Sequence, residues 1–170
     1  MDKNRYIDNR HCSWKTSERC ENMKAQLILE NGKRFSGKLF GDTQNVGGKV
    51  VFSTEMVAYQ SVLTDTKYDG KMVVMTFPLI GNYGINSEDI GTNKVTPKAM
   101  IVREKCDSPS NFRMEMTLED FFKQQGIVGL SGVDTRAVAK QLRDIKEMKA
   151  VIMQGEPTDE EVKAFFKEVE

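Results

Sequence analysis

The sequence predicts a mixed α/β domain that is rich in strands in its first half and alternates strands with helices in its second half. Short apolar runs bounded by turn residues recur between residues 25 and 104, which is typical of strands. From residue 117 onward, helix-capping residues precede apolar positions spaced three and four apart, which is typical of helices. At 170 residues the chain is long enough to bury a core without disulfides or a metal.

The first expected element is a β-hairpin. An apolar run at 26–29 precedes Asn31 and Gly32, and a second run follows at 34–40. Asn-Gly supplies the positive φ angles that a tight hairpin turn demands. A loop over 41–48 is expected to lead to a third strand at 49–53.

A buried strand, a long loop and another strand are expected next. The apolar run at 72–77 predicts a strand that stops at Pro78, because proline cannot donate to a sheet ladder. The glycine-rich stretch 79–91 predicts a long loop, and 99–104 predicts a strand.

Three helices are expected in the second half, with short strands at 127–130 and 149–153 between them. Thr117, Asp134 and Thr158 with Glu161 are expected to cap their beginnings. The first helix should end at Gly126 and the second near Ile145. The inward side chains are expected to be Leu118, Phe121 and Phe122 in the first helix, Val138, Leu142 and Ile145 in the second, and Val162, Phe165, Phe166 and Val169 in the third.

The first 24 residues differ from the rest, because they are polar and follow no period. We expect residues 1–24 to form a disordered tail and residues 25–170 to form the domain. The tail holds the only histidine, His11, beside Cys12 and Cys20, a set that lacks a fourth ligand for zinc.

Composition predicts a cytoplasmic protein. There is no apolar run of about 18 residues, no signal-peptide core, and three scattered cysteines do not form a disulfide framework. Neither a membrane nor a nucleic acid is an expected partner, since 25 basic residues balance 25 acidic residues.

The sequence offers few residues for catalysis. A cysteine or serine nucleophile needs a base, usually histidine, and only His11 is present. We expect no catalytic residue, metal or cofactor in this chain. Two alternatives stay open from the residues alone. Carboxylates in or near loops would supply an acid–base pair; they are Glu55, Asp65, Asp69, Glu88 and Asp89. A basic stripe would face either an acidic partner or solvent; it consists of Arg136, Lys140 and Arg143.

Several segments in order resemble the small chain of glutamine-dependent carbamoyl-phosphate synthetase. Residues 47–86 read GGKVVFSTEMVAYQSVLTDTKYDGKMVVMTFPLIGNYGIN, similar to the family's G-E-V-V-F-N-T-x-M-x-G-Y-Q-E-x-L-T-D-P-S-Y and T-Y-P-x-I-G-N-Y-G. Residues 111–113 read NFR and residues 126–136 read GIVGLSGVDTR, similar to the family's S-N-W/F-R and G-I-x-G-I-x-G-I-D-T-R. The order and spacing match from residue 25 to about residue 153.

The resemblance implies the N-terminal domain of that small chain, with a layered β/β/α fold. In the family, this domain joins the small subunit to the large synthetase subunit, while a second domain of the small chain hydrolyses glutamine with a Cys-His-Glu triad. The large subunit then uses the ammonia to make carbamoyl phosphate from bicarbonate and ATP, for arginine and pyrimidine biosynthesis. The expected partners are the large subunit and a glutaminase domain. We expect that domain to be absent here, and the chain alone to lack glutaminase activity.

The resemblance also marks site positions on two loops and one helix start. The motif and interface positions are Tyr59, Gln60, Thr64, Asp65, Tyr68, Gly81, Asn82, Tyr83, Gly84, Asp134, Thr135 and Arg136. Lys67 stands where the family has the serine that lies at its glutamine pocket. Lysine is longer and charged, so we expect it to block that contact or to need a carboxylate partner, for which Asp65 and Asp69 are candidates.

Further departures from the family pattern keep other interpretations open. Lys49 and Ser61 each replace a glutamate of the pattern. The first alternative is a diverged, stand-alone interaction module that kept the fold and lost the synthetase partner. The second is an independent enzyme that uses the loop carboxylates.

Overall fold

The computed structural model describes residues 23–55, 59–90 and 94–168. The predicted tail, with His11, Cys12 and Cys20, lies outside these residues apart from its last two positions. Lys24 is already part of the first strand, β1 (Lys24–Leu29).

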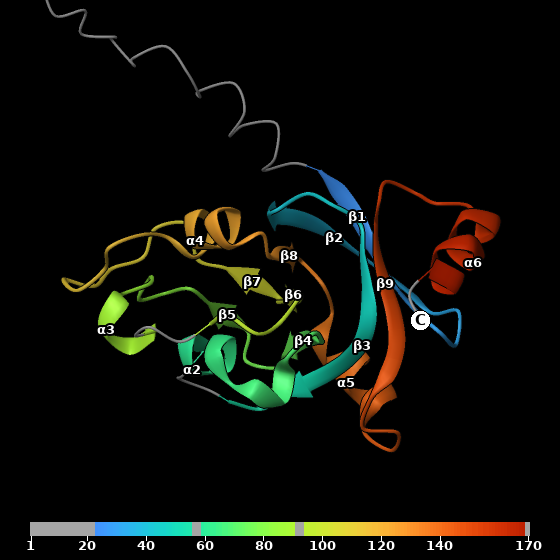
Figure 1. The fold of residues 1–170 in the computed structure, drawn as a ribbon, viewed down its shortest axis with the longest axis horizontal. Coiled ribbons are helices and arrows are strands. Elements are labelled where there is room, and N and C mark those ends of the chain that lie inside the picture. The colour runs from blue at the N-terminus through green and yellow to red at the C-terminus, as the bar shows by residue number, and fades with distance from the viewer. Residues whose placement is uncertain (1–22, 56–58, 91–93, 169–170) are drawn as a thin grey trace, which may run out of the picture.

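Seven strands close into a barrel in the order β1-β2-β8-β6-β4-β3-β9 (Figure 1). The predicted hairpin is confirmed: β1 pairs antiparallel with β2 (Arg34–Gly41), and Gly32 in the turn has φ 82°. The parallel strands are β3 (Val46–Ser53), β4 (Met72–Met75), β6 (Ala99–Ile101) and β8 (Val128–Ser131). The closing strand, β9 (Met148–Gln154), runs antiparallel to both β1 and β3.

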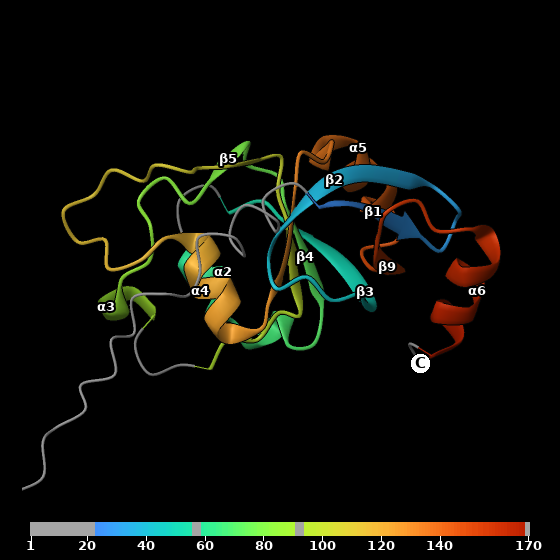
Figure 2. The same ribbon diagram turned by 90° about the horizontal axis from the view of Figure 1, so that it is seen from above.

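The barrel separates two apolar cores, because alternate residues of each strand point to opposite faces. Leu27, Val50 and Ile101 point inward, and α5 (Thr135–Leu142) adds Val138 and Leu142 to this inner core. On the outer face, Val73 and Met100 meet α2 (Tyr59–Thr64), α3 (Ser87–Ile90) and α4 (Leu118–Gln125). These three helices therefore lie together on one side of the barrel (Figures 1 and 2).

The last helix, α6 (Asp159–Glu168), lies at the opposite end of the molecule (Figure 2). Val162 packs against Ile28 and Val151 on the outer surface of β1 and β9, with Phe165 and Phe166 partly buried beside them. The predicted capping box is confirmed, since Thr158 N–H donates to a Glu161 carboxylate oxygen at 2.8 Å. Val169, which was also predicted to point inward, lies outside the described residues.

The predicted mixed α/β domain is confirmed, but several boundaries were wrong. β3 begins at Val46 because Gly47 and Gly48 also pair with β9. The strand expected at 72–77 ends at Met75. The strand expected at 99–104 is two strands, β6 and β7 (Glu104–Lys105). The stretch 79–91, predicted as a long loop, contains the strand β5 (Leu79–Ile80), which pairs with β7. That loop also contains α3.

Two further errors concern helices. Ile145 was expected in the core and is 57% exposed. The helix ends at Leu142, and Lys146, with φ 66°, reverses the chain toward β9. The short helix α2 was not predicted. The caps of the other helices are confirmed: the Thr117 side chain accepts from Asp120 N–H at 3.1 Å, and Asp134 accepts from Ala137 N–H at 3.0 Å.

Gly129 in β8 occupies a position where there is no room for a side chain. A methyl group there would overlap the Phe40 ring, which is buried and stacked on Phe122 with 5.3 Å between centroids. We expect Gly129→Ala to lower the free energy of unfolding by about 1–3 kcal/mol through overpacking. Gly48→Ala is the matched control, because its methyl group would make an ordinary 3.4 Å contact with the Gly70 carbonyl. Urea denaturation of both variants tests the prediction, and equal losses would contradict it.

Candidate functional site

Helix α2 is fastened to the loop at residues 81–84, so two of the predicted motif segments do meet. The Tyr59 hydroxyl donates to the Gly84 carbonyl oxygen, and the Gln60 amide donates to the same oxygen at 3.3 Å. The Gln60 side-chain oxygen accepts from Asn86 N–H at 3.3 Å. Tyr59, Gln60 and Gly84 are all buried. These bonds therefore fix the loop instead of facing a ligand.

The aromatic side chains of this cluster are neutral packing groups. The Tyr59 and Tyr83 rings stack with 4.4 Å between centroids. Burial raises the pKa of Tyr59 far above its usual value, and it raises the pKa of Tyr83 as well. Both hydroxyls therefore remain protonated near neutral pH, and neither is suited to act as a base.

Lys67 lies in the turn that follows α2, on the 3-10 helix η1 (Thr66–Tyr68). Its ammonium lies 2.9 Å from an Asp65 carboxylate oxygen, 4.0 Å from Glu55 and 4.7 Å from the centre of the Tyr68 ring. Asp65 also accepts from Lys67 N–H at 3.0 Å. The hydrogen bond between the two side chains raises the pKa of Lys67 and lowers that of Asp65.

Of the two carboxylates suggested as partners of Lys67, Asp65 makes the contact. Glu55, which was not suggested, lies at the edge of ion-pair distance. The Thr96 hydroxyl anchors the turn, because it donates to the Asp65 carbonyl oxygen at 2.7 Å. Tyr68 is buried, while Lys67 is exposed. The turn therefore has an anchored backbone and an exposed, charged side chain. Thr64 and Asp65 are half-buried, and Asn82 in the second loop is exposed.

The three predicted residues at the start of α5 belong to a different part of the molecule. Asp134 caps the helix, Thr135 is buried, and Arg136 is exposed. Because α5 contributes to the inner core and α2 to the outer core, the structure does not bring these residues into the α2 cluster.

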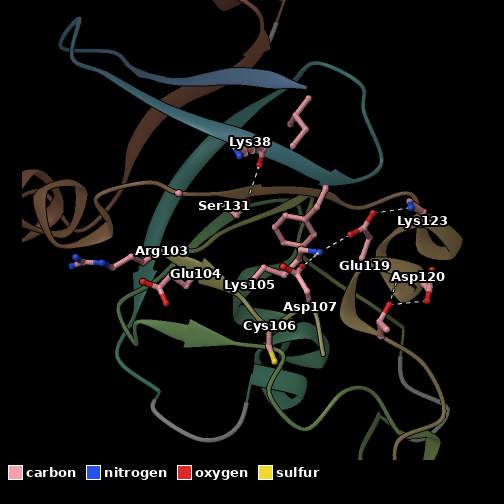
Figure 3. Close-up of a pocket in the computed structure, with 14 residues that line it drawn as sticks. Lys38, Arg103, Glu104, Lys105, Cys106, Asp107, Glu119, Asp120, Lys123 and Ser131 are labelled. Carbon is pink, nitrogen blue, oxygen red and sulfur yellow. Dashed lines mark hydrogen bonds and ion pairs between the residues drawn. The ribbon is translucent and has the colours of Figure 1, made fainter. Parts of the chain in front are cut away.

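A polar cavity of about 720 Å³ lies between β7, α4 and the neighbouring ends of β2 and β8 (Figure 3). Lys105 crosses it with its ammonium 2.6 Å from Glu119 and 2.6 Å from Asp107. Glu119 also lies 2.7 Å from the Lys123 ammonium. The side chains of Lys105 and Glu119 are only 15% and 9% exposed, whereas that of Asp107 is 80% exposed.

Lys105 and Glu119 keep their charges although both side chains are largely buried. Burial alone would raise the pKa of Glu119, but the hydrogen bonds from Lys105 and Lys123 outweigh burial, so its pKa is lowered. Burial alone would lower the pKa of Lys105, but Asp107 and Glu119 outweigh it, so its pKa is raised. The network therefore ties β7 to α4 with opposite charges that neutralise one another.

Sequence reasoning missed this cavity, because Lys105 and Glu119 look like ordinary surface charges. One signal was present. Glu119 is three residues before Phe122, so it lies at the edge of the apolar face of α4, where it is buried.

Within 23–55, 59–90 and 94–168, no three His, Cys, Asp or Glu side chains gather in a way that would hold a metal ion. The single histidine lies outside these ranges, and Cys106 is a free cysteine. Among the described helices, none is long and apolar enough to cross a membrane.

Comparison with known proteins points to one family. A family model described as carbamoyl-phosphate synthase small chain, CPSase domain, matches residues 27–152. The chain is 51% identical over 141 residues to the carbamoyl phosphate synthase small chain of Clostridium perfringens, an alignment that covers 83% of this chain and 40% of that one. It is 51% identical over 122 residues to the protein of the same name from Syntrophotalea carbinolica, covering 72% and 32%.

A third relative, the carbamoyl phosphate synthase small chain of Maridesulfovibrio salexigens, is 46% identical over 147 residues, covering 86% of this chain and 39% of the relative. The chain thus spans about two fifths or less of the length of these relatives. Among solved structures, an aminopeptidase from Aneurinibacillus sp. strain AM-1 aligns at 15% identity with a TM-score of 0.42, covering 79% of this chain and 30% of the aminopeptidase, which is too low to support an inference.

Proposed function

Since this chain belongs to the carbamoyl-phosphate synthase small-chain family, we propose that it is the N-terminal assembly domain of the small, glutamine amidotransferase subunit of a carbamoyl-phosphate synthase. In this role it docks a glutaminase domain and the large, ATP-dependent subunit. The assembled ligase uses ammonia from glutamine to make carbamoyl phosphate in the cytoplasm, for arginine and pyrimidine biosynthesis. The chain itself supplies no catalytic group.

The observation that carries this proposal is the fixed turn around Lys67. Asp65, Lys67 and Tyr68 stand in the segment whose counterpart in the family faces the glutaminase domain. Their backbone is held by Thr96 and by the buried ring of Tyr68, while the Lys67 ammonium is exposed. Ordered loops on a rigid sheet are common binding surfaces. A preformed turn loses little conformational entropy when a partner covers it.

The arrangement of the cores also supports the layered β/β/α organisation of the family. The inner core lies between the two walls of the barrel, which would be the two β layers. The outer core lies between one wall and helices α2, α3 and α4, which would be the α layer. Residues 25–170 would then form the assembly domain, with the charged cavity beside α4 on its surface.

An alternative function is a stand-alone interaction module that kept the fold and lost the synthetase partner. The observation that favours it is the Lys67–Asp65 pair, which occupies the turn with a charge already neutralised inside the chain. A domain that no longer contacts glutamine would tolerate such a pair.

A test of whether this chain associates with synthase partners distinguishes the two proposed functions. We expect this chain to co-elute on size-exclusion chromatography with two partners produced separately from Clostridium perfringens: the remaining part of its small chain and the large chain of its synthase. The control mixes this chain with the remaining small-chain part alone. Elution of this chain as a free species in both mixtures would contradict the assembly role and support the stand-alone module.

A further inference from the structure

Four lysines from different parts of the sequence lie level with one another, two within β9 and β3 and two directly before β4 and β6. In the β3–β9 pairing, Lys49 is directly opposite Lys149. In the β3–β4 pairing, Val50 is level with Met72, so Lys49 is level with Lys71. Met72 is level with Ala99, and Lys98 N–H donates to the Lys71 carbonyl oxygen at 2.9 Å. The lysine row therefore consists of Lys149, Lys49, Lys71 and Lys98.

All four side chains emerge on the outside of the barrel. The residues that follow them belong to the inner core, and successive residues of an extended chain point to opposite faces; these core residues are Val50, Met72, Ala99 and Ala150. Lys49, Lys98 and Lys149 are exposed, and Lys71 is half-buried. Neighbouring strands are about 4.8 Å apart, so the row extends over about 14 Å.

The row is short of negative charge. Glu147 lies 2.6 Å from the Lys49 ammonium and 3.3 Å from the Lys71 ammonium, and these hydrogen bonds lower its pKa. Among the described residues, Lys98 and Lys149 make no ion pair. Like charges directly opposite each other destabilise a sheet. The fold does not demand this arrangement, because the family pattern has glutamate at the place of Lys49.

We propose that the lysine row is a docking site for an acidic segment of a partner protein, bound in an extended conformation. An extended chain advances about 3.3 Å per residue and shows alternate side chains on one face, so carboxylates at three alternate positions extend over about 13 Å. That length matches the row. The row contains lysines and no arginine, and lysine ammonium groups select for charge more than for a precise geometry. A run of acidic side chains is therefore a better match than a single small anion. The proposed site does not include Lys67, although the row adjoins its turn, because Lys71 N–H donates to the Tyr68 carbonyl oxygen at 3.0 Å.

The test uses the full chain and a fluorescein-labelled peptide with glutamate at every second position and serine between. Fluorescence anisotropy at low ionic strength should show binding that weakens as salt is added. The double variant Lys98→Glu with Lys149→Glu should bind about tenfold or more weakly. The matched control is Lys24→Glu with Lys163→Glu, which changes net charge equally on exposed lysines of β1 and α6 and should bind like the parent protein.

Three results would overturn the proposal. They are absence of peptide binding to the parent protein, equal weakening in the row variant and the control, and tighter binding of single-stranded oligothymidylate than of the peptide. Misfolding does not obscure the outcome. Lys149→Glu places a carboxylate opposite Lys49, so the melting temperature of the row variant should equal or exceed that of the parent protein.

Discussion

Replacing Glu119 with alanine is expected to lower the free energy of unfolding by about 2–4 kcal/mol. The Glu119 carboxylate is buried and lies between the ammonium groups of Lys105 and Lys123. Its removal leaves Lys105, which is only 15% exposed, with Asp107 as its remaining carboxylate. A buried charge that loses a partner keeps its desolvation penalty without the compensating attraction. Urea denaturation monitored by circular dichroism measures the loss.

Asp107→Ala is the matched control, because Asp107 and Glu119 lie at the same 2.6 Å from the same ammonium. Asp107 is 80% exposed, so water replaces its contribution, and the expected loss is about 1 kcal/mol or less. Equal losses in the two variants would show that burial of the pair does not matter.

The pH dependence of stability gives a second check on Glu119. Its pKa in the folded protein is below the ordinary value of 4.5. A depressed pKa contributes stability that is fully present above the unfolded value and is lost as the pH falls through the folded value. The parent protein should therefore lose more stability than Glu119→Gln when the pH is lowered from about 6 to about 3. Identical acid profiles would mean that Glu119 is not held in its charged form.

The second large effect concerns Lys67 in a chain that has a glutaminase domain. When the remaining part of the Clostridium perfringens small chain is fused to this domain, Lys67→Ser is expected to lower the KM for glutamine about tenfold. The Lys67 ammonium would face the α-ammonium of glutamine as a like charge, and a tenfold change corresponds to about 1.4 kcal/mol. Steady-state ammonia release measures KM and kcat separately.

Two further variants identify the cause of the expected change in KM. Lys67→Met removes the charge without supplying a hydroxyl group, so it should recover the part of the effect that is due to repulsion. Lys163→Ser changes an exposed lysine on α6, which packs on β1 and β9, and should leave KM unchanged. If Lys67 and Lys67→Ser fusions bind glutamine equally well, Lys67 is a solvated surface residue and does not block the contact.

Local signals in the sequence predicted local structure well. Asn31 and Gly32 marked the hairpin because their backbone preferences alone determine a tight turn. Thr117 and Asp134 marked two helix starts because capping bonds reach only three residues along the chain. Ile145 was misplaced because the periodic pattern continued past Leu142, where the helix ends, and up to the turn at Lys146.

Features that depend on distant segments were not predictable in this way. Closure of the barrel requires β9 to pair with both β1 and β3, and no periodic pattern encodes such pairing. Helix α2 is six residues long and is stabilised by tertiary bonds from Tyr59 and Gln60 to Gly84. The Lys105–Glu119 pair joins residues on two elements whose approach is a property of the fold. By contrast, Asp65 could be predicted as a partner of Lys67, because the two residues lie in one turn.

Reconstitution of glutamine-dependent carbamoyl phosphate synthesis tests the central claim most directly. This chain, the remaining part of the Clostridium perfringens small chain and the large chain of its synthase are mixed, and product is measured with glutamine or with ammonia as nitrogen donor. The claim predicts that the mixture with all three parts uses glutamine, that omission of this chain abolishes glutamine use while ammonia use continues, and that this chain alone releases no ammonia from glutamine. Glutamine-dependent synthesis at the same rate with and without this chain would contradict its role as the assembly domain.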